Sequence, residues 1–222
     1  MFFATRAPLV LRRGVRLVDA KQGAVTVGGS TDVAMPANRF DVLVLALLAA
    51  GYDDPNSAPS LAGFTTLQTR GDTTDYARHR VAYCVNPGAS KILTLNSTTR
   101  NAAYILYSFI GAKLDEAPSC ADASGPEGVI GPNPPSRTPT VDGSEIIVMG
   151  TRVDTTTTTG YGAPSGYSDL LVQSAGDTAS QNAILLAARK NQATAAAEDP
   201  GNFTPTTLFG DWGAATVVIK PA

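Results

Sequence analysis

Residues 76–85 read YARHRVAYCV, and this stretch is the clearest alternating segment of the chain. Side chains of an extended chain point alternately to opposite sides. One side therefore carries every second residue from Ala77 to Val85, and the other carries every second residue from Tyr76 to Cys84. The Asn-Pro-Gly sequence at 86–88 is typical of a turn. The pattern predicts a β-strand with two different faces that ends at this turn.

A second strand is expected nearby, over residues 41–50 (DVLVLALLAA). A short, nearly continuous apolar run is typical of a strand buried on both faces. A helix is the alternative, because leucine and alanine both favour helices.

Further segments along the chain alternate or are rich in branched and aromatic residues. They lie at residues 64–69, 91–96, 102–110, 145–153, 167–174 and 214–220. Residues 7–34 add two or three short apolar pieces punctuated by glycine. Residues 181–197 permit either a strand or a helix that Ser180 would cap. About ten to twelve strands with turns between them predict an all-β protein, an antiparallel β-sandwich of jelly-roll-like type with long loops.

The composition changes between residues 113 and 143, which contain six prolines and four glycines. A long segment without periodicity is typical of a functional loop, so we expect one Pro/Gly-rich loop here. The predicted β-sandwich domain covers residues 36–222. Residues 1–35 form either an N-terminal arm that anchors the protein or the first strands of the sandwich.

Charge and length exclude several classes of protein. The 222 residues carry a net charge of −2, and only 16% of them are charged. This leaves no basic surface for nucleic acid. No apolar run reaches the roughly 18 residues of a membrane-spanning helix, so no membrane insertion is expected. Residues 1–14 (MFFATRAPLVLRRG) do not follow the order of a signal peptide.

The sequence contains few candidate catalytic residues. His79 is the single histidine, and Cys84 would point to the opposite face of the same strand. With two cysteines, Cys84 and Cys120, neither a disulfide framework nor a zinc site is expected. A glycoside hydrolase or an esterase remains a weaker alternative, resting on His79 and on acidic pairs at 53–54, 115–116 and 198–199. We expect no catalytic residues, no metal site and no cofactor.

Three aromatic residues are candidates for a glycan-binding surface: Trp212, Tyr161 and Tyr167. Each lies in or near a segment expected to be a loop, and an exposed aromatic ring can stack on a sugar. The alternative is that Trp212, the single tryptophan, closes one end of the sandwich core.

Several segments, in this order, resemble those of a known group of proteins. They are residues 40–44 (FDVLV), 63–67 (GFTTL), 80–85 (RVAYCV), 102–111 (AAYILYSFIG), 142–148 (DGSEIIV) and 217–221 (VVIKP). Their order resembles that of β-sandwich proteins encoded in the structural gene modules of tailed bacteriophages and gene transfer agents. Phe40 stands where that group has glycine, Phe64 where it has tryptophan, and one extra residue separates Tyr107 from Gly111.

The resemblance implies a non-enzymatic structural protein located in the virion, as a head decoration, spike or fibre component. Its implied partners are other capsid or tail proteins and further copies of itself. A carbohydrate-binding module that recognises cell-surface glycan is the alternative, and the two roles are compatible.

Overall fold

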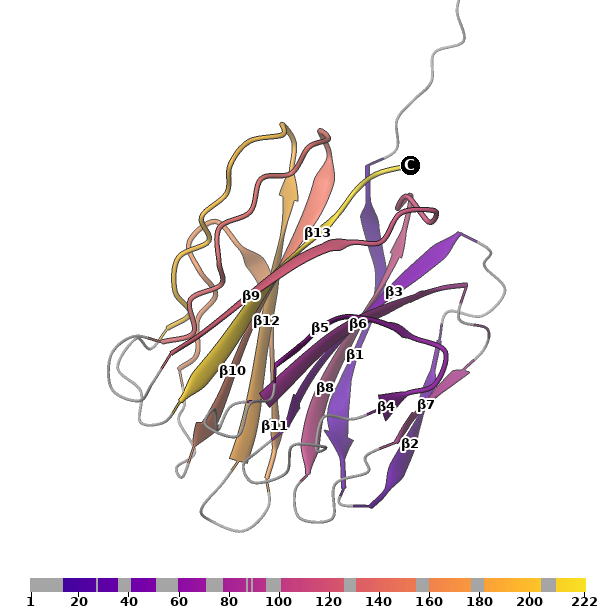
Figure 1. The fold of residues 1–222 in the computed structure, drawn as a ribbon, viewed down its shortest axis with the longest axis vertical. Coiled ribbons are helices and arrows are strands. Elements are labelled where there is room, and N and C mark those ends of the chain that lie inside the picture. Colours follow the sequence, from indigo (N-terminus) through magenta and orange to yellow (C-terminus); the bar gives the residue numbers. More distant parts are fainter. Residues whose placement is uncertain are drawn as a thin grey trace, which may run out of the picture.

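The computed structural model describes residues 14–26, 28–35, 41–50, 60–70, 78–86, 88, 90–94, 101–125, 131–154, 160–176, 182–204 and 211–222. Every regular element in these ranges is a β-strand (Figure 1). The prediction of an all-β protein is confirmed.

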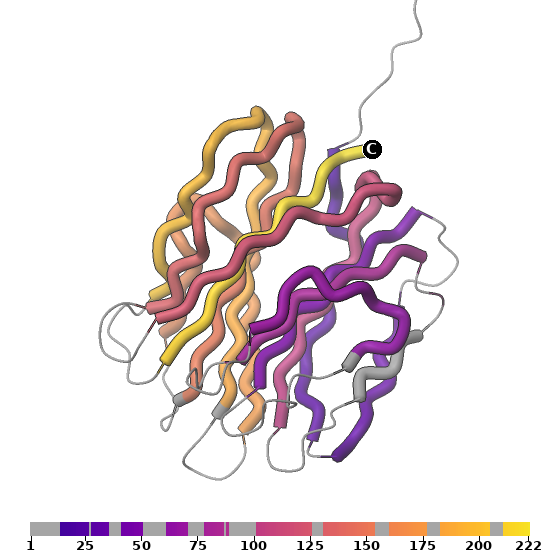
Figure 2. Tube along the Cα trace, viewed as in Figure 1, coloured from indigo at the N-terminus to yellow at the C-terminus, as the bar shows by residue number. Residues whose placement is uncertain are grey.

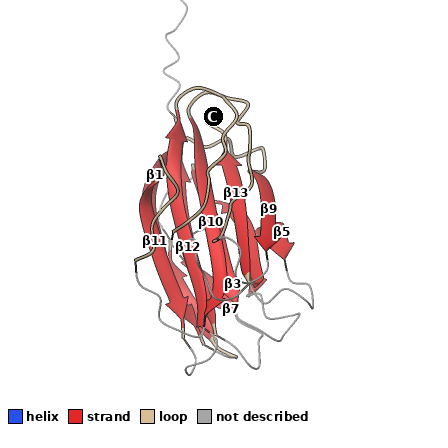
Figure 3. Ribbon diagram, turned by 90° about the vertical axis from the view of Figure 1, so that its left-hand side faces the viewer, coloured by secondary structure: helices blue, strands red, loops and turns tan. Residues whose placement is uncertain are grey.

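Two antiparallel sheets of five strands form the body of the molecule (Figures 1 and 3). In spatial order the first sheet contains β1 (Arg16–Val25), β8 (Ala102–Ile110), β3 (Val42–Ala50), β6 (Arg78–Val85) and β5 (Thr65–Arg70). The second contains β11 (Ser168–Ala175), β12 (Asn182–Gln192), β10 (Ser144–Asp154), β13 (Trp212–Ile219) and β9 (Ser119–Gly125). A small third sheet contains β2 (Ser30–Ala34), β7 (Ser90–Thr94) and β4 (Ser60–Leu61). The predicted β-sandwich is confirmed.

Each main sheet is built from one half of the chain. Figure 2 shows the earlier, indigo-to-magenta part on one side and the orange-to-yellow part on the other. The chain passes from the first main sheet to the second once, between β8 and β9. The two sheets also approach one another at both lateral edges, where β1 lies near β11 and β5 lies near β9. At the second of these edges, Arg70 and Asp122 form an ion pair of 3.0 Å between the sheets.

The main core lies between the two sheets, and two further cores cover their outer faces. Alternate residues of β3 divide between cores: Leu43, Leu45 and Leu47 enter the main core, whereas Val44 and Leu48 pack with residues of β2 and β4 on the outer face. Every residue of β3 is buried. The predicted strand with two buried faces is therefore confirmed, and the helical alternative is wrong.

Loops cover the outer face of the second sheet. Phe203 is fully buried there among residues of β10 and β12. Its backbone N–H donates to the carbonyl of Pro132 at 3.0 Å, and Gly162 and Thr204 exchange two backbone hydrogen bonds of 3.0 Å. The loops around residues 132, 162 and 203 are thus bound to one another. The second sheet consequently has apolar packing on both faces.

The expectation of one uninterrupted loop over residues 113–143 requires correction, because β9 lies inside this segment. Its sequence, SCADASG, contains no branched or aromatic residue, so local propensity gives no indication of a strand. Seven consecutive positions pair with β13, and this pairing supplies the hydrogen bonds.

The structure resolves the open choice at residues 181–197 in favour of a strand, since β12 extends over residues 182–192. It pairs with β10 on one side and β11 on the other. Cross-strand packing on both faces outweighs the helix propensity of its leucines and alanines. At the N-terminal end, residues 16–25 form one continuous strand paired with β8, and Gly23 lies within it rather than in a turn. Residues 1–13 lie outside the described ranges.

Candidate functional site

The three aromatic residues considered for glycan binding all lie on the loop-covered side of the second sheet. Trp212 was expected in a loop, but it is the first residue of β13, where it pairs with Gly125 and with Arg152. Its indole ring covers Gly125: a Cβ atom placed there would lie 2.5 Å from the ring. The ring is partly buried, so one of its roles is to pack against the neighbouring strand.

Tyr161 and Tyr167 have different surroundings. The partly buried ring of Tyr161 lies 5.9 Å from the guanidinium carbon of the buried Arg152. Tyr167 is only 9% exposed, and the Lys190 ammonium lies 5.7 Å from its ring centre. Burial, reinforced by Glu198, raises the pKa of Tyr167 well above its usual value.

Only two of the three aromatic residues lie near the same end of the second sheet. Trp212 and Tyr161 both neighbour Arg152. Tyr167 instead neighbours Lys190, which pairs with Ile146. Ile146 and Arg152 are six positions apart along β10, a distance of about 20 Å. The structure therefore brings Trp212 and Tyr161 to one end of the sheet and buries Tyr167 near the other.

The candidate catalytic residues are dispersed. His79 is 1% exposed, and its Nδ1 lies where a side chain on Gly213 would have to be. Cys84 is buried on the outer face of the first sheet, so the expected opposite orientation of His79 and Cys84 is confirmed. Cys120 is also a free thiol, partly buried against the main core.

In each acidic pair that the structure describes, the glutamate is engaged in an ion pair. Glu116 accepts hydrogen bonds from Lys113, at 3.0 Å, and from Lys220. These two partners lower the pKa of Glu116. Glu198 accepts a hydrogen bond from Lys190 at 2.8 Å. The pair at residues 53–54 lies outside the described residues.

An ionic group around the buried Glu145, which sequence analysis did not anticipate, joins three strands of the second sheet. Arg189 donates to Glu145 at 2.7 Å and forms an ion pair of 2.6 Å with Asp169. Asn191 donates to the other oxygen of Glu145 at 3.2 Å. Glu145 is 1% exposed, so these contacts replace the hydrogen bonds that water would give an exposed side chain. Asp169 has a φ of 54°, a left-handed conformation that aspartate tolerates better than most residues.

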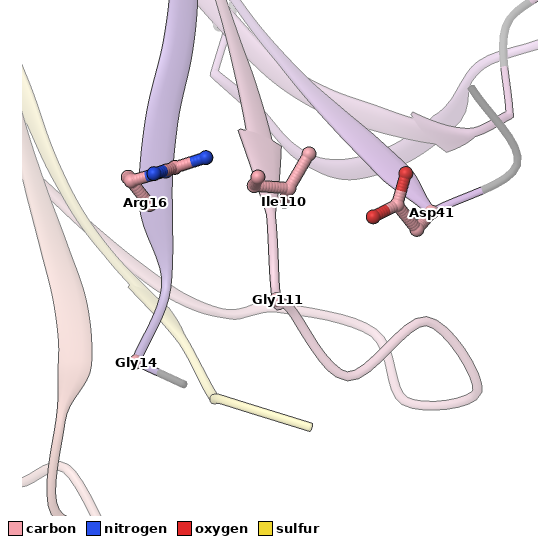
Figure 4. Close-up of a pocket in the computed structure, with 5 residues that line it drawn as sticks. All are labelled: Gly14, Arg16, Asp41, Ile110 and Gly111. Carbon is pink, nitrogen blue, oxygen red and sulfur yellow. The ribbon is translucent and has the colours of Figure 1, made fainter. Parts of the chain in front are cut away.

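A cavity of about 510 Å³ opens at the end of the first sheet, where β1 and β3 begin and β8 ends (Figure 4). Its lining includes Gly14, Arg16, Asp41, Ile110 and Gly111. A second cavity of about 580 Å³ shares Asp41 and Gly111 with the first. Volumes of this size are typical of small-molecule sites.

Two charged side chains flank the floor of the first cavity. Figure 4 shows the Arg16 guanidinium and the Asp41 carboxylate on opposite sides of Ile110, both extending toward it. Both residues are exposed, and neither has a hydrogen-bond or ion-pair partner among the described residues. The sequence gives only one hint of this arrangement, an aspartate directly before a buried strand. It is the pairing of β1 and β3 with β8 that brings the two charges together.

Within the described ranges, no three or more histidine, cysteine, aspartate or glutamate side chains are grouped to hold a metal ion. That part of the chain also has no helix that is long and apolar enough to cross a bilayer. No protein-family model, curated protein or solved structure matches the chain.

Proposed function

We propose that this protein is a non-enzymatic structural component of a tailed phage or phage-like particle, displayed on its surface as a head decoration, spike or fibre component. One observation carries the proposal. Each of the six sequence segments that resemble virion β-sandwich proteins overlaps one strand of the two main sheets: β3, β5, β6, β8, β10 or β13. The resemblance therefore follows the order of the strands in the sandwich.

The packing of the body supports this role. Both main sheets have apolar cores on their two faces, and the sheets approach one another at both lateral edges. Among the described residues, Val85 and Val172 are the exposed large hydrophobic side chains, at 38% and 37%. A rigid body with few exposed apolar side chains suits a component that must stay folded on the outside of a particle.

Immunogold electron microscopy of particles from the source culture tests the proposal, with antibody raised against the recombinant protein. We expect gold on the head for a decoration or head-spike protein, and on the tail for a tail or fibre component. Mass spectrometry of the purified particles must also detect the chain. Unlabelled particles, with the protein found free in the medium, would exclude a virion role.

Glycan recognition is the second candidate, and it rests on Trp212 and Tyr161, which lie near one another beside Arg152. A glycan array should show binding that Trp212→Ala abolishes and Trp212→Phe, which keeps an aromatic ring, partly retains. Val172→Ser on the exposed face of β11 is the matched control. Absence of binding to any glycan by the unaltered protein would remove this candidate.

A further inference from the structure

The cavity at the end of the first sheet carries an inference that is independent of a virion role. Its floor is Ile110, a partly buried apolar residue in the second strand of the sheet. Arg16 on β1 pairs directly with Ile110, and so does Val42 on β3, the residue after Asp41. Both charged residues line the cavity, and Figure 4 shows their side chains on either side of that of Ile110.

The separation of the two charges follows from the sheet. β1 and β3 are both neighbours of β8, and adjacent strands lie about 4.8 Å apart. The backbones that carry Arg16 and Asp41 are therefore about 10 Å apart, with β8 between them. Charge-assisted hydrogen bonds are about 2.8 Å long. A ligand that carries both a carboxylate and an ammonium, as an α-amino acid does, can make such a bond to each of the two side chains.

Two other charged residues, Lys113 and Asp115, line the adjoining cavity and not this one. The Lys113 ammonium binds Glu116 at 3.0 Å. Arg16 and Asp41 have no such partners among the described residues. Each would gain a strong interaction from a ligand of opposite charge. Gly14 and Gly111 bring backbone without side chains to the cavity lining, which leaves room for that ligand.

We propose that this cavity binds a free α-amino acid with an apolar side chain. Arg16 binds the carboxylate through its guanidinium, which can donate two parallel hydrogen bonds. Asp41 accepts hydrogen bonds from the ammonium. The apolar side chain of the amino acid packs on Ile110. Selectivity arises because a ligand that lacks either charge leaves Arg16 or Asp41 without its partner.

Titration of the full-length protein, labelled with ¹⁵N, tests the proposal by NMR. The probes are leucine, isoamylamine, which lacks the carboxylate, and 4-methylpentanoate, which lacks the ammonium. We expect leucine to shift the amide signals of Gly14 and Gly111 at about 10 mM, as a millimolar dissociation constant requires. The two singly charged analogues should bind about tenfold to a hundredfold more weakly, since each loses one charged hydrogen-bonding group.

Variants separate recognition from loss of folding. Arg16→Gln and Asp41→Asn should each weaken leucine binding by about tenfold or more. Both side chains are exposed, so the variants should retain the amide spectrum of the folded protein. Lys21→Gln, an exposed cation on the same strand, is the control and should bind leucine normally. Unshifted glycine signals with leucine, or equal binding of all three probes, would overturn the proposal.

Discussion

The imidazole of His79 packs directly against the backbone of Gly213, across the interface between the two main sheets. A methyl group placed on Gly213 would lie 2.6 Å from Nδ1 of His79 and 2.8 Å from the hydroxyl oxygen of Thr151. Both distances are shorter than real carbon contacts allow. The single histidine therefore occupies space that only a glycine on the opposite sheet leaves free.

This contact predicts that Gly213→Ala destabilises the protein by about 1–3 kcal/mol, as overpacking of a core does. Urea unfolding followed by circular dichroism measures the change. Gly14→Ala is the matched control, because its new methyl would lie at an ordinary distance of 3.6 Å from the nearest atom. If His79 is the obstacle, the loss caused by Gly213→Ala should be smaller in a His79→Ala background. Equal losses in both backgrounds would contradict this explanation.

The ionic group around Arg189 predicts unequal effects for its two carboxylates. Glu145 has a side chain only 1% exposed, whereas that of Asp169 is 51% exposed. Glu145→Gln should cost about 3 kcal/mol, because it leaves Arg189 and Asn191 facing a neutral group in a buried place. Asp169→Asn should cost less than about 1 kcal/mol, because water screens an exposed pair. Chemical denaturation measures the free energy of unfolding of both variants. An equal loss of stability in the two would contradict the explanation that burial makes Glu145 more important than Asp169.

The burial of Tyr107 predicts that the protein loses stability at alkaline pH. Its side chain is fully buried in the main core, and burial raises the pKa of its phenol well above the usual value of 10.0. Its hydroxyl has no hydrogen-bond partner among the described residues. The unfolded chain ionises this phenol near pH 10 and the folded chain does not. The stability present below pH 10 should therefore be lost as the pH rises above it.

Tyr107→Phe should remove this contribution. We expect a variant at least as stable at pH 7, since no hydrogen bond among the described residues is lost, and a smaller loss of stability between pH 9 and 11. Thermal melts of both proteins across this range provide the comparison. A variant that is clearly less stable at pH 7 would indicate that the hydroxyl has a partner.

Cys120 should react slowly although it lies in an edge strand. Burial raises the pKa of its thiol to about 12, against the small opposing effect of Arg137. At pH 8 the reactive thiolate is then about one molecule in ten thousand, compared with about one in ten for an unburied thiol. In a Cys84→Ala background, alkylation by iodoacetamide should be about a thousandfold faster in urea than in the folded protein. Comparable rates in the two states would refute a buried thiol.

Local sequence was sufficient for much of the sandwich. The alternation at 76–85 and the apolar run at 41–50 predict strands, and the structure has β6 and β3 there. The local pattern of these segments is enough to predict a strand, because branched and apolar side chains recur at every second position or form a short continuous run, and turn residues follow. The all-β class and the sandwich follow from many such segments in one chain.

Other elements have no local signal and form strands because of contacts with distant segments. β9 consists of small and polar residues and is a strand because β13 offers it hydrogen bonds. Gly23 continues β1 because the ring of Tyr104, on the paired strand, covers it. Residues 182–192 form a strand because both of their faces are buried by other segments.

The same division holds for the candidate sites. The composition establishes which residue types are present: one histidine, two cysteines, one tryptophan and few charged residues. It did not determine that Tyr167 is buried, that Glu145 meets Arg189, or that Arg16 and Asp41 flank Ile110. Such pairs are distant along the chain, and their proximity depends on the register of three or more strands. Because a shift of one residue reverses every side chain of a strand, only the assembled sheets decide which groups meet.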